Sequence, residues 1–153
     1  MKNNLALFGG EKIRTKPFTV LPAIGQEERD LVDEVLSSGM LSGFIAQPGE
    51  SFLGGPKVRA LEKLFCDYFK VPHAVAMNSA TAGLHAALIA AGVGAGDEVI
   101  VTPYTMSASA VVILMQNAIP VFADIDPANF CLDPADIRRK VTPRTKAIIV
   151  VHL

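Results

Sequence analysis

The segment His73–Gly94, with the sequence HAVAMNSATAGLHAALIAAGVG, decides the fold of this chain. Residues His73–Met77 predict a short buried strand, and the small and apolar residues 80–91 predict a helix. The turn between them contains Ser79 and Thr81. Because the first turn of a helix carries unpaired N–H groups and a partial positive charge, this turn predicts an anion site. We expect it to hold the phosphate group of a cofactor.

The same turn has a plainer interpretation, in which it binds nothing. Ser and Thr are favoured at helix N-caps, where the side-chain oxygen accepts a hydrogen bond from a backbone N–H group. Ser79 and Thr81 are then caps only. Capping is the more common use of these residue types, so on the turn alone both interpretations stay open.

The composition is that of a globular protein, with 50% hydrophobic and 19% charged residues in a chain of 153. The net charge of −1 provides no overall field that would attract nucleic acid or an anionic membrane surface. Cys66 and Cys131 lie in no metal-binding or redox spacing. The longest apolar run, around Ala108–Met115, is too short to span a bilayer, and no signal peptide is visible. These features indicate a cytoplasmic enzyme or binding domain, with neither nucleic acid nor membrane as a partner.

The N-terminal third differs from the rest. Residues 1–25 predict an extended arm, since Pro17 and Pro22 break regular structure. Residues 26–38 predict an amphipathic helix that ends before Gly39. The expected apolar stripe of this helix consists of Leu31, Val32, Val35 and Leu36. Residues 39–55 predict a long glycine-rich loop, which is either functional or a plain surface excursion. A helix over residues 56–70 follows.

The remainder of the chain alternates strands with helices. The expected strands are His73–Met77, Glu98–Thr102, Pro120–Asp124 and Lys146–Val151. The expected helices between them are 80–91, 106–117 and 134–140. This order predicts a three-layer α/β/α fold, in which a mainly parallel sheet has right-handed crossovers and helices on its faces. We therefore divide the chain into residues 1–54, an arm with a helix and a loop, and residues 55–153, part of an α/β domain.

Ligands of open α/β sheets bind beyond the carboxyl ends of the strands. The residues expected at those ends are Ser79, Ala80, Thr81, Tyr104, Met106, Asp124, Asp126 and His152. This set of residues is more typical of a cofactor site than of a protein–protein surface. Each member also has a structural alternative. Tyr104 and Met106 are common core residues, and Asp124 and Asp126 are common turn residues beside Pro127.

Two further sets of polar residues have structural explanations. His85 lies within an apolar helix and is interpreted as a histidine with a satisfied structural contact. The basic residues Arg138, Arg139, Lys140, Arg144 and Lys146 are most simply a solvated face.

The sequence ends at Leu153, directly after an apolar strand, and we therefore expect a fragment of a longer protein.

Several motifs occur in order over residues 55–153: Ser-Ala-Thr before a helix, Gly-Asp-Glu-Val-Ile, Pro-Tyr-Thr, Pro-Val-Phe-x-Asp-Ile-Asp, and Pro-Arg-Thr-Lys-Ala-Ile. Each is weak alone, but the ordered set closely resembles the large domain of the nucleotide-sugar aminotransferases of the DegT/StrS group. These are fold-type-I enzymes that depend on pyridoxal 5'-phosphate (PLP). The Gly-Gly-Pro segment Gly54–Pro56 also fits.

The resemblance implies roles for particular residues. Ser79, Ala80 and Thr81 match the phosphate cradle of the family. Met106 falls where the family usually has an aromatic residue stacked on the pyridine ring, with Tyr104 two residues before it. The Schiff-base lysine and the acid that contacts the pyridinium nitrogen are expected after Leu153, so no catalytic residue is assigned within the chain.

The resemblance also implies a reaction. The full-length protein is expected to transfer an amino group from glutamate or glutamine to a keto-sugar nucleotide, and to act as a homodimer. Two alternatives remain open. Relatives with histidine in place of the lysine are sugar dehydratases, and a chain without the lysine and the acid would be a non-catalytic domain of this fold.

Overall fold

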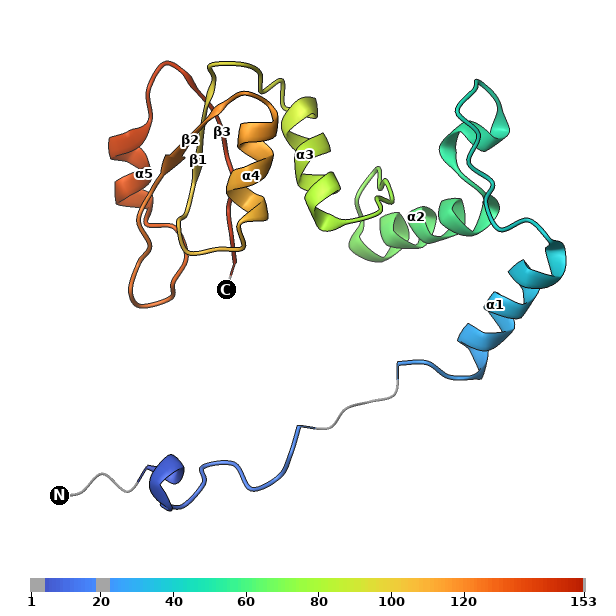
Figure 1. Cartoon of the computed structure of the whole chain (residues 1–153), viewed down its shortest axis with the longest axis horizontal. Helices are drawn as coiled ribbons and strands as arrows, with labels where there is room; N and C mark the ends of the chain where they lie inside the picture. The colour runs from blue at the N-terminus through green and yellow to red at the C-terminus, as the bar shows by residue number, and fades with distance from the viewer. Residues whose placement is uncertain (1–4, 19–22, 153) are drawn as a thin grey trace. The chain divides into compact units, whose positions relative to one another are not determined.

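The computed structural model describes residues 5–18 and 23–152. The chain forms two compact units, Met1–Ala60 and Leu61–Leu153. Figure 1 shows the α/β arrangement of the second unit. The predicted domain boundary after residue 54 stays a prediction.

A three-stranded parallel sheet forms the centre of the second unit. Its strands are β1 (Glu98–Val101), β2 (Ile119–Phe122) and β3 (Thr145–Ile148), in the order β2-β1-β3. β1 pairs with both neighbours, and a register irregularity separates Glu98 from Val99 on the β3 side. Pro120 lies in β2, an edge strand of this sheet, where a missing N–H group is tolerated. The predicted parallel sheet is confirmed, with strands shorter than expected.

Helices cover both faces of the sheet. The helices that cover it are α3 (Ala80–Ala90), α4 (Ala108–Met115) and α5 (Pro134–Lys140). α3 and α4 lie on one face, and α5 lies on the other (Figure 1). The connection from β1 to β2 and the connection from β2 to β3 cross the sheet in opposite directions. Right-handed crossovers therefore place α4 and α5 on opposite faces. The predicted three-layer α/β/α architecture is confirmed.

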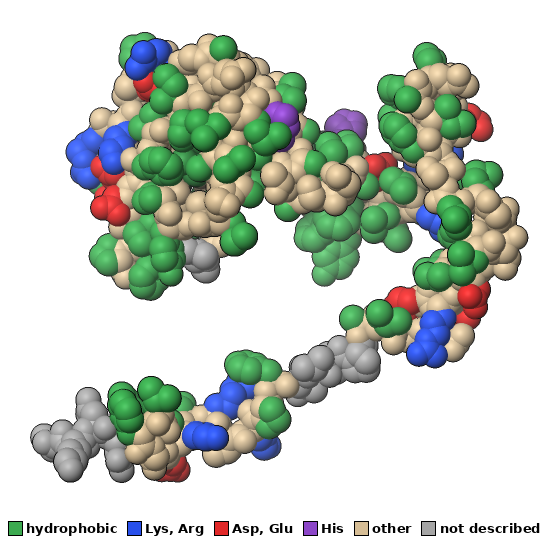
Figure 2. All heavy atoms as spheres, in the orientation of Figure 1, with side chains coloured by type: hydrophobic (Ala, Val, Ile, Leu, Met, Phe, Trp, Pro, Cys, Tyr) green, Lys and Arg blue, Asp and Glu red, His purple; other side chains and the backbone are tan. Residues whose placement is uncertain are grey.

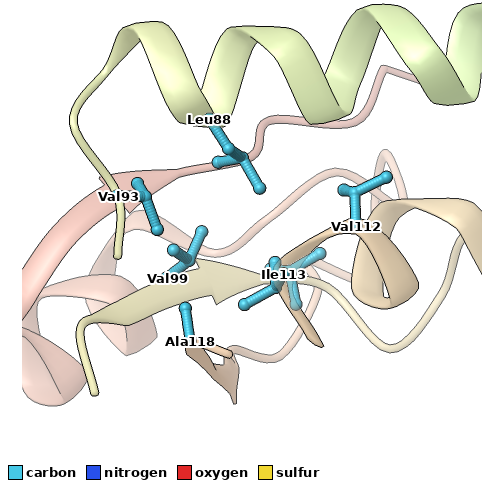
Figure 3. Packing of buried hydrophobic residues seen from close by; sticks show 7 residues of the cluster. Leu88, Val93, Val99, Val112, Ile113 and Ala118 are labelled. Atoms are coloured by element: carbon cyan, nitrogen blue, oxygen red, sulfur yellow. The ribbon is translucent and has the colours of Figure 1, made fainter. Parts of the chain in front are cut away.

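Two hydrophobic clusters hold these layers together, one on each side of β1. Because side chains alternate along a strand, Val99 and Val101 contact the α3/α4 layer while Ile100 faces the α5 layer. The first cluster consists of Leu88, Val93, Val99, Val101, Val112, Ile113 and Ala118, most of which Figure 3 shows pointing toward one another. The second consists of Ile100, Ala123 and Leu132. β1 is fully buried along its length because both faces are covered.

The predicted strand His73–Met77 is wrong for the described chain. These residues pair with no strand of the described sheet, and Val75 and Met77 are exposed. The amide of Ala76 donates instead to a side chain, Oε1 of Glu62, at 2.8 Å. An apolar segment becomes a strand only when a neighbouring strand accepts and donates its ladder hydrogen bonds. Here the described sheet is made by β1, β2 and β3 alone.

The helix boundaries agree closely with the sequence, except at α4. The predicted helix 134–140 matches α5, and 80–91 exceeds α3 by one residue. α4 is shorter than the predicted 106–117. It ends before Asn117, which adopts a left-handed backbone with φ of 54°. Left-handed residues terminate helices, and Asn tolerates that conformation better than most residues.

The first unit contains η1 (Ala6–Phe8), α1 (Gln26–Ser38) and η2 (Glu50–Leu53). α2 (Pro56–Phe69) begins in this unit and ends in the second. The predicted helix 26–38 matches α1, and 56–70 exceeds α2 by one residue. At the N-terminus of α1 the amide of Gly25 donates to Oε2 of Glu28, and Gly39 ends the helix with φ of 68°.

The apolar stripe predicted on α1 is largely exposed, with only Val35 half-buried. The predicted loop 39–55 contains η2 as a short helical turn. Within it, Gly43 and Gly55 approach so closely that a Cβ atom on Gly43 would lie 2.6 Å from Cα of Gly55. In the predicted arm 1–25, the described residues contain only η1, while residues 1–4 and 19–22 lie outside the described residues.

Candidate functional site

The N-terminus of α3 is the first part of the candidate site. Ser79 is the N-cap, with an extended backbone, and its Oγ accepts a hydrogen bond from the amide of Ala82 at 3.1 Å. The carbonyl of Ser79 accepts from the amide of Gly83. The amides of Ala80 and Thr81 donate to no acceptor among the described residues. Capping therefore occupies Ser79 but leaves two helix N–H groups for an anion.

The surroundings of these amides allow a phosphate group to approach. Ser79, Ala80 and Thr81 are exposed, and a Cβ atom on Gly83 would meet nothing within 4 Å. The Thr81 hydroxyl adds a donor to the two amides. Donors at a helix N-terminus match the charge of a phosphate, so the residues present fit the phosphate group of PLP.

The loop after β1 contributes the second part. Thr102 is buried, and its Oγ1 accepts from the amide of Tyr104 at 3.1 Å. The side chains beyond it are exposed, Tyr104 by 54% and Met106 by 78%. Neither side chain fills the core of the described chain, so the structural alternative for both is wrong here. Both remain available to contact a ligand.

The loop after β2 shows the opposite outcome for the two aspartates. Oδ1 of Asp126 accepts from the amide of Ala128 at 2.8 Å, and Oδ1 of Asp124 accepts from the amide of Ile125 at 2.8 Å. Short aspartate side chains commonly stabilise turns in this way. Asp124 and Asp126 therefore act as turn residues, as their structural alternative predicted.

A buried carboxylate behind this loop was missed by the sequence analysis. Asp136 is 6% exposed. Its Oδ2 accepts from the amide of Asp124 at 2.6 Å and from Nζ of Lys140 at 2.8 Å, and its Oδ1 accepts from Arg139 at 2.9 Å. The hydrogen bond from Lys140, followed by those from the Asp124 amide and Arg139, lowers the pKa of Asp136 to about 2. The side chain is therefore a carboxylate at neutral pH.

Two of the residues interpreted as a solvated face thus have specific partners. Charged side chains gather over α5 in Figure 2, and Arg139 and Lys140 pair there with Asp136. The spacing of three and four residues along one helix was the signal that could have revealed these pairs.

A second buried carboxylate lies at the other end of the sheet. Glu98 is 4% exposed and accepts hydrogen bonds from Oγ1 of Thr142 at 2.5 Å and from Nε of Arg144 at 2.9 Å. The hydrogen bond from Thr142, followed by the hydrogen bond and charge of Arg144, lowers the pKa of Glu98 despite its burial. Arg144 is therefore also more than part of a solvated face. These contacts join β1 to the segment that enters β3.

The predicted site residues lie on one side of the sheet. Figure 1 shows that α3 and α4 begin on the side where β1 and β3 end. The Ser79–Thr81 turn and the Tyr104 loop share that side, as do the turn after β2 and the exposed His152. His85 lies apart from them, within α3, where its ring contacts Nε2 of Gln116. This agrees with a structural role for His85.

The comparison with protein-family models matches residues 22–153 to the DegT/DnrJ/EryC1/StrS aminotransferase family. This chain belongs to that family. The match includes the turn at Ser79–Thr81 and all three strands, and the resemblance seen in the motifs is confirmed. The family depends on PLP, so the cofactor expectation is confirmed at the family level.

Similar proteins include the L-glutamine:2-deoxy-scyllo-inosose aminotransferase of Streptomyces lividus, 44% identical over 100% of this chain and 35% of its own length. The spore coat polysaccharide biosynthesis protein SpsC of Bacillus subtilis is 48% identical over 86% of this chain and 31% of its own. The solved structure of NtdA from Bacillus subtilis with bound cofactor PMP is 32% identical, with a TM-score of 0.72 over 85% of this chain and 28% of NtdA.

This chain spans about a third of the length of the curated relatives it matches. Within the described part of the chain, no helix is long and apolar enough to cross a membrane.

Proposed function

We propose that the full-length protein is a PLP-dependent aminotransferase that moves an amino group from glutamine or glutamate to the ketone of a sugar or cyclitol. The observation that carries this proposal is the α3 N-terminus. It presents two amides that have no acceptor among the described residues, together with the Thr81 hydroxyl, on the carboxyl side of a parallel sheet in a chain of this family.

In this proposal the residues of the chain bind and orient the cofactor. Ser79, Ala80 and Thr81 hold the phosphate group, and Ser79 also fixes the helix turn by capping it. Met106 and Tyr104 contact the ring, Met106 through its polarisable sulfur. PLP supplies an electron sink for the carbon that gains or loses the amino group.

The acceptor is proposed to be a keto-sugar nucleotide. The name of the Streptomyces lividus relative gives glutamine as donor and an inosose as acceptor, which supports a cyclic polyhydroxyketone and favours glutamine. The name of SpsC supports an acceptor destined for a polysaccharide. We further propose that the protein acts as a homodimer in the cytoplasm.

The first test measures PLP binding to the full-length apoprotein by titration of visible absorbance. Thr81→Ala removes one donor to a charged group, and we expect PLP to bind about tenfold more weakly. Thr81→Ser retains the hydroxyl group and serves as the matched control, with affinity close to wild type. Equal affinity in all three proteins would overturn the assignment of the phosphate site.

The second test incubates the holoenzyme with glutamine and either a keto-sugar nucleotide or a keto-cyclitol, and detects the amino product by mass spectrometry. Amino product from the keto-sugar nucleotide supports the proposed acceptor. Product from the cyclitol alone supports amino transfer and replaces that acceptor. Loss of water from the sugar without amino transfer would indicate a dehydratase, and a protein without PLP or turnover would be a non-catalytic member of the fold.

A further inference from the structure

Two loops on the carboxyl side of the sheet meet through a pair of aromatic rings. Tyr104 follows β1, and Phe130 lies in the longer loop after β2. The ring centroids are 5.8 Å apart, with an interplanar angle of 36°. This separation lies within the range at which aromatic rings attract one another. Tyr104 is 54% exposed, so about half of its surface stays open to solvent beside this contact.

The backbone of Phe130 is held in an uncommon conformation. Its φ of 60° lies in the left-handed region, which bulky residues rarely adopt. Hydrogen bonds within the loop maintain it. The amide of Phe130 donates to the carbonyl of Asp126 at 2.8 Å, and the amide of Asp126 donates to the carbonyl of Cys131 at 2.8 Å. A strained residue persists where its surroundings determine it in this way, and such residues cluster at functional sites.

The base of the same loop is tied to the buried frame of the domain. The carboxylate of Asp136 accepts from the amide of Asp124, and Nζ of Lys140 donates to the carbonyl of Phe122 at 2.6 Å. Leu132, which is buried, forms an isolated bridge with Ile125 across the loop. The loop that presents Phe130 is therefore fixed at both of its ends.

On the other side of the ring pair, the buried Thr102 holds the amide of Tyr104. Tyr104 is thus fixed through its backbone by Thr102 and through its ring by Phe130. We infer that Phe130 is a positioning residue, which orients the Tyr104 ring toward the PLP site. This inference rests on the proposed function. It adds a residue for which neither the motifs nor the comparisons give a role.

The experiment uses four forms of the full-length protein: wild type, Phe130→Asn, Tyr104→Leu and the double variant. Asn removes the ring but tolerates the left-handed backbone, so Phe130→Asn preserves the turn. Phe130→Tyr retains a ring at this position and is the matched control. The main readout is the PLP dissociation constant of the apoprotein, and thermal unfolding of each apoprotein reports whether the fold is retained.

We expect Phe130→Asn to weaken PLP binding by between about twofold and about tenfold, the effect of losing one aromatic contact. Phe130→Tyr is expected to bind PLP as the wild type does. The decisive comparison is the double variant. If Phe130 acts through Tyr104, Phe130→Asn has no further effect on PLP binding in the Tyr104→Leu background.

Equal effects of Phe130→Asn in both backgrounds would overturn the inference, because Phe130 would then act independently of Tyr104. So would an unchanged dissociation constant in Phe130→Asn. If Phe130→Asn unfolds, the same comparison is made with Phe130→Gly, which also accepts the left-handed backbone. Failure of the proposed function looks different, since Thr81→Ala and Tyr104→Leu would then both leave PLP affinity unchanged.

Discussion

The two ends of the central sheet differ in how their polar groups are used. At the amino end, the Glu98 carboxylate is 4% exposed and is satisfied by Thr142 and Arg144. At the carboxyl end, two helix amides have no acceptor among the described residues, and the Met106 side chain is 78% exposed. The same three strands therefore have one end closed by side-chain contacts and one end available to a ligand.

This difference separates stability from binding. The closed end fixes the register of β1 against β3, where an irregularity occurs beside Glu98. The open end retains small residues and donors that have no acceptor within the described part of the chain, and such donors contribute little to the fold unless an anion binds. We therefore expect substitutions at the two ends to affect different measurements, and substitutions between them to affect both.

The largest effect on stability is expected from a substitution in the middle of β1, between the two ends of the sheet. Ile100 is fully buried against Ala123 and Leu132. Ile100→Ala should lower the free energy of unfolding by about 2–5 kcal/mol, since it removes buried groups and leaves a cavity. Urea denaturation of the full-length protein measures this change. Ile148→Ala, on the neighbouring strand β3, should lower the free energy of unfolding less, because the Ile148 side chain is half-exposed. Equal losses would show that the second cluster does not hold the sheet.

A smaller effect is expected at the closed end. Glu98→Gln removes the charge that faces Arg144 and should lower the melting temperature by about 5 °C. The PLP dissociation constant should change by less than about twofold, because the two ends are independent. Glu34→Gln is the control, because it breaks the exposed pair between Glu34 and Lys57, which should contribute little. A large change in PLP affinity in Glu98→Gln would show that the two ends are coupled.

The last effect is confined to acid, since the titration of Asp136 changes the stability only below its ordinary pKa of 3.8. Its pKa is lowered from 3.8 to about 2 by the hydrogen bonds of Lys140 and the Asp124 amide. The folded state therefore gains stability from this carboxylate above pH 3.8, and loses it as the pH falls toward 2. Urea denaturation at several pH values in this range gives the free energy of unfolding. This free energy should fall less steeply with decreasing pH in Asp136→Asn than in the wild type.

Lys140→Gln provides the complementary test. Removing the strongest partner of Asp136 should raise the pKa of that carboxyl toward its ordinary value of 3.8, so the pH range over which stability is lost should narrow and the total loss in acid should be smaller. Identical pH profiles in the wild type and both variants would show that another group controls acid unfolding.

The local elements of the fold could be predicted from the sequence because each depends on neighbouring residues. α5 begins where Asp133 caps it, with Pro134 in its first turn, and α1 ends at Gly39. The Ser79 cap followed the same local rule, and the order of strands and helices sufficed for the parallel three-layer arrangement. The sequence could therefore locate the turn of the candidate site before its surroundings were known.

Only the tertiary structure decided which distant residues meet. Glu98 finds Thr142 and Arg144 at separations of 44 and 46 residues, and the Tyr104–Phe130 pair joins two loops that no motif connects. The segment His73–Met77 has the composition of a strand but pairs with no strand among residues 5–18 and 23–152, which the structure describes. Ladder pairing, burial of a charge and contact between loops depend on what the fold brings together, whereas caps and periodicity depend on the local chain.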